Sequence, residues 1–129
     1  MSDIKEITNA LLNFRDERDW AQYHNPKDLA ISLCLEASEL LEIFQWKSSE
    51  QVEKVKSDPE MRNRVKEELG DIFIYALTIA HEFGLDPTQI VFDKIETNEK
   101  KYPAEKVKGK SKKYTQYWFQ NGRCPRTLF

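Results

Sequence analysis

The sequence predicts an all-α protein, a bundle of the four-helix type whose core is completed by dimerisation. Three observations predict this class. The chain has 4 glycines in 129 residues, too few for a turn-rich β protein. No segment shows sustained alternation of apolar and polar residues, whereas several show apolar residues at helical spacing. Asn-Pro or Asp-Pro pairs precede three of those segments.

The first helix is expected over roughly residues 3–19, after Ser2 or Asp3 at its N-cap. Its apolar positions have the spacing of one helix face, which predicts that this face is buried. They are Ile4, Ile7, Leu11 and Phe14.

The next helix starts follow from the three Pro pairs, at 25–26, 58–59 and 86–87. Asn or Asp at an N-cap accepts a hydrogen bond from a free backbone N–H, and Pro at the first helical position has no N–H to leave unpaired. Helices are therefore expected over 27–46, 60–83 and 87–101, the last ending before Pro103. Ser48 or Ser49 predicts the cap of a short helix over 50–56, and Gly84 predicts the end of the long one.

The helices over 27–46 and 60–83 are apolar on more than one face. The segment 72–80, "IFIYALTIA", contains no charged residue. A helix that is hydrophobic all round lies centrally or against another chain. In a chain of 129 residues this predicts a homo-oligomer, a homodimer or homotetramer. Cys34, inside the apolar run, is expected to be a small core residue.

Charge is distributed unevenly along the chain. Residues 1–99 carry 11 Lys and Arg against 21 Asp and Glu, whereas residues 100–129 carry 9 against 1. Such a basic segment contacts nucleic acid, a membrane, an anionic ligand or the acidic body, or is merely solvated. Two cysteines make no disulfide framework, and no signal peptide or membrane-spanning stretch is recognisable, so we expect a cytoplasmic protein.

Two carboxylate pairs stand out on the apolar helices. Glu36 and Glu39 are three residues apart and share a helix face, as do Glu68 and Asp71. Four partly buried carboxylates on facing helices repel one another unless cations, shared protons or a metal neutralise them. Few Lys or Arg residues lie near these positions. All four are therefore predicted metal ligands, whereas Glu42 is not.

Oxygen ligands without Cys or clustered His select hard cations, so Mg²⁺ is expected first, with Mn²⁺ or Ca²⁺ as alternatives. A di-iron redox bundle is disfavoured because it needs Glu-x-x-His motifs, and neither His24 nor His81 follows one of these glutamates at that spacing.

The arrangement Glu36-x-x-Glu39 and Glu68-x-x-Asp71 resembles the E-x-x-E…E-x-x-D signature of the MazG-type all-α nucleoside triphosphate pyrophosphohydrolases. Further motifs make the chain similar to the dCTP pyrophosphatase branch over roughly residues 7–115. These are "RDW" at 18–20, "H-x-P" at 24–26, "FQWK" at 44–47, "EEL-x-D" at 67–71 and "K-x-x-x-N-x-x-x-YP" at 94–103.

The resemblance implies a helical bundle of tight dimers that often pair into tetramers. It implies hydrolysis of a deoxynucleoside triphosphate between the α- and β-phosphates to dNMP and pyrophosphate, with Mg²⁺ held by the four carboxylates. These carboxylates are also the candidate catalytic residues, with Glu39 expected to orient or deprotonate the water. The candidate substrate-binding residues are Trp20, His24, Trp46, Tyr75, Lys94, Asn98 and Tyr102.

Alternatives accompany these assignments. Trp46 and Tyr75 lie on apolar helices, so plain core positions are the other interpretation, and His24 either touches substrate or orients the 20–27 loop. Leu11 departs from the branch, which has a histidine near that position. We expect a domain over 1–115 and a tail of unknown role over 116–129, "QYWFQNGRCPRTLF".

The expected function is nucleotide-pool house-cleaning, with dCTP or a modified dCTP as the favoured substrate. The alternatives are a dUTPase-like enzyme, a broad-specificity MazG-type enzyme, or a non-enzymatic helical protein that binds nucleic acid through its basic tail. The last is disfavoured because the basic residues lie in a 30-residue tail and not along one helix face. We expect neither a nucleic-acid partner nor a membrane.

Overall fold

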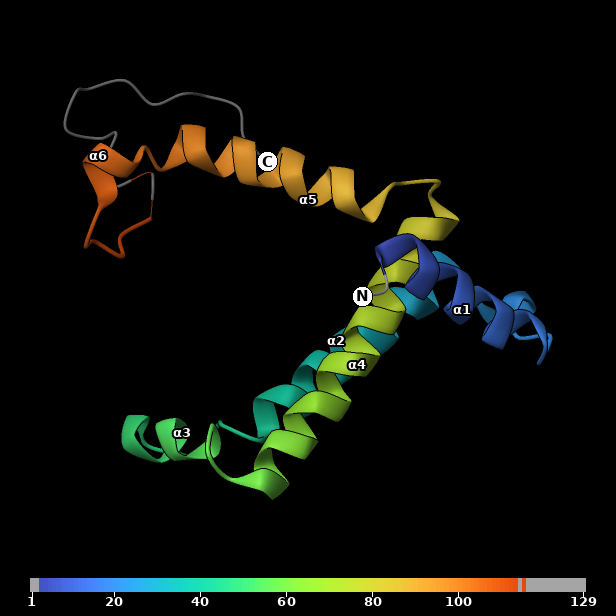
Figure 1. Cartoon of the computed structure of the whole chain (residues 1–129), viewed down its shortest axis with the longest axis horizontal. Helices are drawn as coiled ribbons and strands as arrows, with labels where there is room; N and C mark the ends of the chain where they lie inside the picture. The colour runs from blue at the N-terminus through green and yellow to red at the C-terminus, as the bar shows by residue number, and fades with distance from the viewer. Residues whose placement is uncertain (1–2, 114, 116–129) are drawn as a thin grey trace. The chain divides into compact units, whose positions relative to one another are not determined.

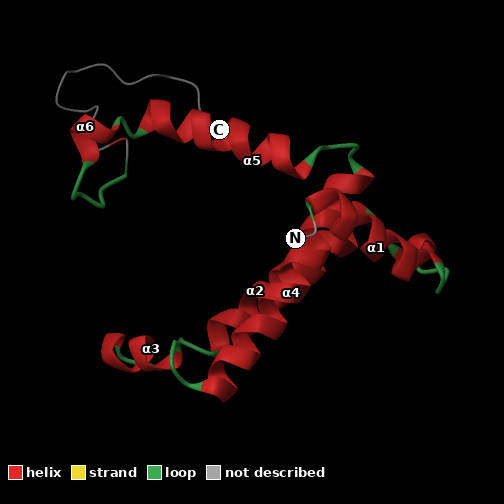
Figure 2. Cartoon of the chain, in the orientation of Figure 1, coloured by secondary structure: helices red, strands yellow, loops and turns green. Residues whose placement is uncertain are grey.

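The computed structural model describes residues 3–113 and 115, and in these residues it contains helices and loops but no strand (Figure 2). The predicted all-α class is confirmed. The helices are α1 (Ile4–Asp16), η1 (Ala21–Tyr23), α2 (Pro26–Glu42), α3 (Ser49–Val55), α4 (Pro59–Glu82), α5 (Pro87–Lys101) and α6 (Ala104–Val107), and Figure 1 labels all of them except η1.

The helix starts lie where the Pro pairs predict them. The Asn25 side chain accepts a hydrogen bond from the N–H of Asp28, and the Asp58 side chain accepts one from Met61 at 3.0 Å. Asp3 caps α1 in the same way. Ser48 and Gln51 form a reciprocal capping box at the start of α3, because each accepts a hydrogen bond from the backbone N–H of the other.

Two helix ends differ from the expectation, and two short helices are additional. The first helix ends at Asp16, because the chain turns through Asp19 in a left-handed conformation with φ of +53°. α2 ends at Glu42, and the residues after it form a turn. The short helices η1 and α6 were not predicted, since three or four residues are too few to show a period. Gly84, with φ of +63°, lies just past the end of α4 as predicted.

The chain divides into two compact units, residues 1–87 and 88–129. The expected 1–115 domain remains a prediction, and most of the expected tail lies outside the described residues.

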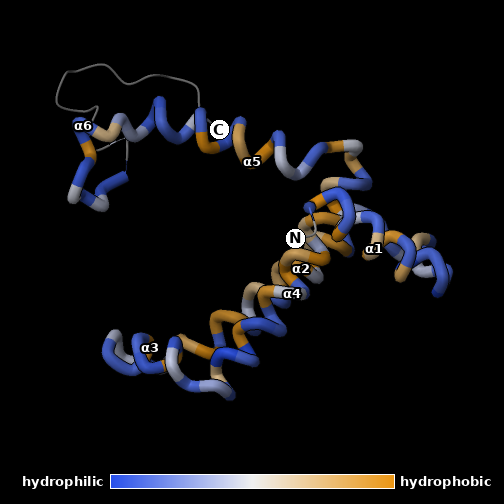
Figure 3. The backbone as a smooth tube through the Cα atoms, in the orientation of Figure 1, coloured by the Kyte–Doolittle hydropathy of each residue, from blue (hydrophilic) through white to orange (hydrophobic). Residues whose placement is uncertain are grey.

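In the first unit, α2 and α4 lie side by side and run in opposite directions (Figure 1), and α1 packs against α4. Figure 3 shows apolar positions along both α2 and α4. The residues buried in this unit are few: Arg15, Leu29, Ile43, Val55, Thr78 and Ala80.

Much of the apolar surface of the α2–α4 pair is uncovered in the single chain. A groove of about 910 Å³ is lined by Phe44, Val52, Val55, Val65, Leu69, Gly70 and Phe73, with Lys56, Arg62 and Lys66 beside them. Phe73 is 63% exposed. The expectation that Cys34 is a core residue is wrong for the single chain, in which Cys34 is an exposed free thiol, because no other element of the first unit covers that side of α2.

None of the described helices is long and apolar enough to cross a membrane.

Candidate metal centre

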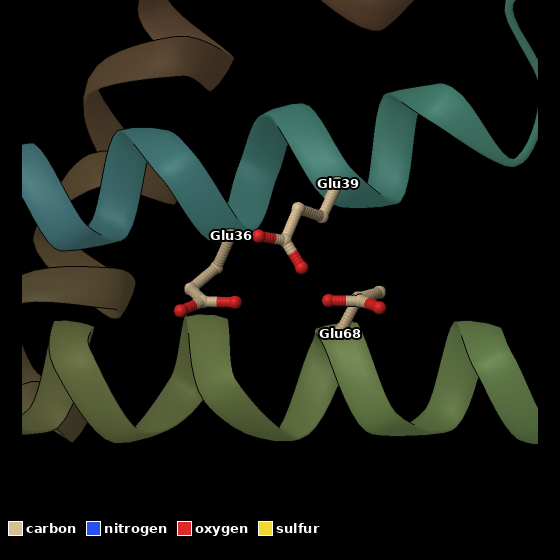
Figure 4. A group of neighbouring side chains, drawn as sticks. All are labelled: Glu36, Glu39 and Glu68. Carbon is tan, nitrogen blue, oxygen red and sulfur yellow. The ribbon is translucent and has the colours of Figure 1, made fainter.

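Three of the four predicted carboxylates converge between α2 and α4. Glu36 and Glu39 extend from α2, and Glu68 extends from α4 toward them (Figure 4). One oxygen from each of the three carboxylates lies within 4.8 Å of the others. The helix spacing places Glu36 and Glu39 one turn apart on the same face, and the antiparallel pairing of α2 and α4 brings Glu68 opposite them.

Burial and neighbouring carboxylates raise the pKa of Glu36 and of Glu68. Partial burial raises the pKa of Glu36 above its usual 4.5, and the charges of Asp71, Glu39 and Glu68 add to the effect. Burial likewise raises the pKa of Glu68, followed by the charges of Glu39, Asp71 and Glu67, while Arg64 acts in the opposite direction. These shifts mean that the ionised form of the cluster is destabilised when no cation lies beside it.

No Lys or Arg in the described part of the chain forms an ion pair with Glu36, Glu39 or Glu68. Glu67, the neighbour of Glu68, instead accepts a hydrogen bond from the Asn63 amide at 2.8 Å. In the described residues the cluster therefore has no Lys or Arg partner to neutralise its charge. A divalent cation in that role is consistent with the arrangement.

Asp71 lies one turn after Glu68 on α4 and is exposed. It is not part of the group of three oxygens within 4.8 Å. Its charge nevertheless raises the pKa of both Glu36 and Glu68, so Asp71 interacts electrostatically with the cluster. Its predicted role as a fourth ligand remains a prediction.

The donor set is chemically uniform, because all its atoms are carboxylate oxygens. Such donors suit hard divalent cations and offer nothing that favours softer metals. Glu39 is exposed, whereas Glu36 and Glu68 are half-buried, so the cluster opens on the side of Glu39. The negative charge of this site repels an anionic substrate unless a bound cation reverses the charge of the site.

Four of the predicted substrate-binding residues lie in the first unit with the carboxylates. Trp46 is 88% exposed, so the alternative that it packs in the core of its own chain is wrong. Tyr75 is half-buried on α4, one turn after Asp71. His24 is half-buried, and its Nδ1 atom is buried without a hydrogen-bond partner among the described residues. Trp20 is 46% exposed.

Trp20 is not brought to the carboxylates of its own chain. The backbone N–H of Trp20 donates to the carbonyl of Arg15, and the Arg15 side chain pairs with Glu82. Glu82 follows Glu68 by 14 residues, or roughly 21 Å along a helix that rises about 1.5 Å per residue. Sequence reasoning did not identify the neighbours of Trp20, which are Phe14 in the last turn of α1 and Arg18 in the turn that follows the helix.

Lys94, Asn98 and Tyr102 belong to the second unit. Lys94 and Asn98 are one turn apart on α5, and the N–H of Tyr102 donates to the carbonyl of Asn98 at 2.8 Å. Lys94 and Asn98 therefore share one face of α5, and all three assignments remain predictions.

Comparison with known proteins gives the family. A model of the MazG-like family matches residues 31–116, a range that includes all four predicted carboxylates. The chain belongs to the MazG-like family.

Curated members of comparable sequence are proteins named dCTP pyrophosphatase 1. The one from Bos taurus is 38% identical over 112 residues, and the one from Homo sapiens is 34% identical over 113 residues. These alignments cover 87% and 88% of this chain but 66% of each relative, so the chain spans slightly less than two thirds of the proteins that it matches.

A solved structure resembles most of the chain. A pyrophosphatase from Archaeoglobus fulgidus is 40% identical and superposes with a TM-score of 0.73, over 80% of this chain and 94% of that one. The resemblance to the MazG-type family that the carboxylate motifs indicated is thus confirmed.

Proposed function

We propose that this MazG-like chain is a nucleoside triphosphate pyrophosphohydrolase, which hydrolyses a deoxynucleoside triphosphate between the α- and β-phosphates to dNMP and pyrophosphate. The observation that carries the proposal is the convergence of Glu36, Glu39 and Glu68 to within 4.8 Å. The names of the curated relatives, dCTP pyrophosphatase 1, favour dCTP or a modified dCTP as substrate. A role in cleaning the nucleotide pool follows from that reaction.

The proposed cofactor is Mg²⁺, with Mn²⁺ as the alternative, held by Glu36, Glu39 and Glu68 together with Asp71. The all-oxygen donor set and the absence of paired cations around it in the described residues support a hard divalent ion. Such an ion, when bound, neutralises phosphate charge and makes the phosphorus more electrophilic.

The residues of the chain have separate tasks in this proposal. Glu36, Glu68 and Asp71 would hold the cation together with Glu39, and the cation would supply the positive charge that a triphosphate needs at this acidic site. Glu39, the exposed carboxylate of the group, accepts a hydrogen bond from the attacking water and directs its oxygen at the α-phosphorus. The new P–O bond forms as the bond to the β-phosphate oxygen breaks, so that pyrophosphate leaves in line.

The nucleotide would be bound by the aromatic and polar residues assigned above. The 88% exposure of Trp46 supports a ligand-facing role, because burial of so large an apolar side chain against a ligand is more favourable than its exposure to water. Tyr75 and Trp20 complete the proposed base and sugar contacts, with His24 beside them. Lys94, Asn98 and Tyr102 are proposed phosphate and sugar contacts, and Lys94 offsets charge on the leaving group.

We also propose that the active form is a homodimer or homotetramer. An apolar groove of about 910 Å³, lined by Phe44 and by residues of α3 and α4, is open in the single chain. Exposed apolar side chains such as Phe73 in this groove are typical of a surface that another chain covers. A cytoplasmic location is proposed as well, since Cys34 is a free thiol and suits a reducing compartment.

The test is a panel of dNTPs and NTPs with Mg²⁺, in which products are separated by ion-exchange chromatography. We expect dCMP and pyrophosphate, with all turnover abolished by EDTA and restored by Mg²⁺. Preferential cleavage of dUTP, or equal cleavage of all dNTPs, would keep the reaction and replace the substrate. Release of orthophosphate would reject the mechanism.

No turnover of any nucleotide would favour the non-enzymatic alternative. That protein would bind nucleic acid with a steep dependence on salt, and the binding would not depend on Glu68.

A further inference from the structure

Trp20 lies in a small cluster with Phe14 and Arg18, at the C-terminal end of α1. The rings of Phe14 and Trp20 meet edge to face, with centroids 5.8 Å apart and planes at 77°. The guanidinium carbon of Arg18 lies 3.7 Å from the centroid of the Phe14 ring and 6.0 Å from that of Trp20. The edge-to-face ring pair has a geometry that aromatic pairs prefer, and the guanidinium lies at distances that cation–π pairs adopt. The indole therefore has a defined orientation.

The backbone before Trp20 is held in an unfavourable conformation. Asp19 has a φ of +53°, the only positive φ at a residue other than glycine in the described ranges. The Gln22 side-chain amide donates to the carbonyl of Asp19 at 2.9 Å and to its carboxylate at 2.8 Å. A strained residue persists only where its surroundings determine it, and such residues concentrate at ligand sites.

This turn is anchored to the main helix pair through Arg15. The N–H of Trp20 donates to the carbonyl of Arg15 at 3.1 Å. The Arg15 side chain is only 10% exposed and pairs with Asp16 at 2.8 Å and with Glu82 of α4 at 3.1 Å. The backbone position of Trp20 is therefore fixed from α4, and its ring position is set by Phe14 and Arg18.

We propose that Phe14 and Arg18 are positioning residues, which hold the indole of Trp20 ready to stack against the base of the nucleotide. This inference rests on the proposed function, in which Trp20 contacts the base. Trp20 stays 46% exposed within the cluster, so part of the indole is open to a ligand. A ring that is already oriented loses little freedom when the base arrives, and the nucleotide binds more tightly for that reason.

Neither positioning residue is part of the core. Phe14 is 48% exposed, and the Arg18 side chain is 41% exposed. Arg18 also donates to the carbonyl of Phe14 at 2.8 Å, so its position depends on α1 itself. Substitution of either residue is expected to leave the helices folded, so changes in catalysis report on Trp20.

The test is a double-mutant cycle on the best substrate of the nucleotide panel. Phe14→Leu removes the ring but keeps an apolar side chain, and we expect it to raise KM about threefold to tenfold with kcat unchanged. Phe14→Tyr keeps the ring and should retain the wild-type KM. In the Trp20→Ala background, Phe14→Leu should have no further effect, because a residue that acts through Trp20 has nothing left to position.

An unchanged KM for Phe14→Leu, or the same fold-change with and without Trp20, would overturn the proposal. If Trp20→Ala itself leaves KM unchanged while the wild-type enzyme hydrolyses nucleotide, the assignment of Trp20 and this inference fail but the reaction stands. Absence of any hydrolysis would instead reject the proposed function. If Phe14→Leu is unfolded by circular dichroism at the assay temperature, the same cycle with Arg18→Gln decides the question.

Discussion

Glu36 on α2 and Glu68 on α4 present carboxylate oxygens within 4.8 Å of each other. Two like charges at this separation destabilise the folded chain unless something neutralises them. The family to which the chain belongs and the oxygen-only donor set both agree with a divalent cation in that role. Four predictions follow from this and from the neighbouring features of the fold.

Glu68→Gln should lower kcat/KM for nucleotide hydrolysis about 100-fold or more, because it removes one of the three converging charges that we propose as ligands of the cation. Steady-state kinetics with Mg²⁺ measures the effect. The matched control is Glu67→Gln, which removes the adjacent carboxylate, hydrogen-bonded to Asn63 and outside the group of three. Equal losses in the two variants would contradict the assignment.

The metal-free protein should become less stable as the pH rises above the usual carboxyl range. Burial and neighbouring charges raise the pKa of Glu36 in the folded chain. The folded state therefore holds this proton more tightly than the unfolded state does. That stabilisation is complete below the unfolded pKa and is lost as the pH rises through the folded pKa.

Glu36→Gln should accordingly raise the Tm of the metal-free protein at pH 7, and the difference from wild type should shrink to near zero below about pH 4.5, the usual value for this group. Thermal unfolding in EDTA between pH 4 and 8 measures it. Glu42→Gln, which removes a charge outside the cluster of three, should give a smaller gain. A Tm difference for Glu36→Gln that does not change with pH would show that the charge of Glu36 is not responsible.

Phe73→Lys should shift the protein toward monomer. Phe73 is 63% exposed and lines the apolar groove beside α4, where a charged side chain opposes burial by a second chain. Size-exclusion chromatography with light scattering measures the mass over a range of concentrations, and we expect the dissociation constant to rise about tenfold or more. Tyr23→Lys is the control, since Tyr23 is similarly exposed at 67% and lies outside the groove. A monomeric wild type would contradict the proposed oligomer.

Asp58→Ala should lower the free energy of unfolding by about 1 kcal/mol, because Asp58 caps α4 by accepting a hydrogen bond from Met61. Urea unfolding followed by circular dichroism measures the change. Asp58→Asn keeps an acceptor at the cap and should stay close to wild type. Equal effects of the two substitutions would mean that the charge of Asp58, and not its hydrogen bond, stabilises α4.

The amino-acid sequence by itself determined where most helices begin and which carboxylates share a helix face. Asn25 and Asp58 before Pro at 26 and 59 act within one turn of chain, and so does the spacing of Glu36 and Glu39. Such local effects can be read from neighbouring residues alone. The apolar character of α2 and α4 was equally plain.

Only the tertiary structure decided what these helices leave exposed and which distant residues meet. The approach of Glu68 to Glu36 depends on the register of α2 against α4, which no local signal specifies. Cys34 was expected in the core and Trp46 had a core position as its alternative interpretation, yet both are exposed, because burial depends on what covers a face. The turn at Asp19, where Gln22 donates to the Asp19 carbonyl and carboxylate, brings Trp20 against Phe14, and the sequence pattern alone did not indicate this contact.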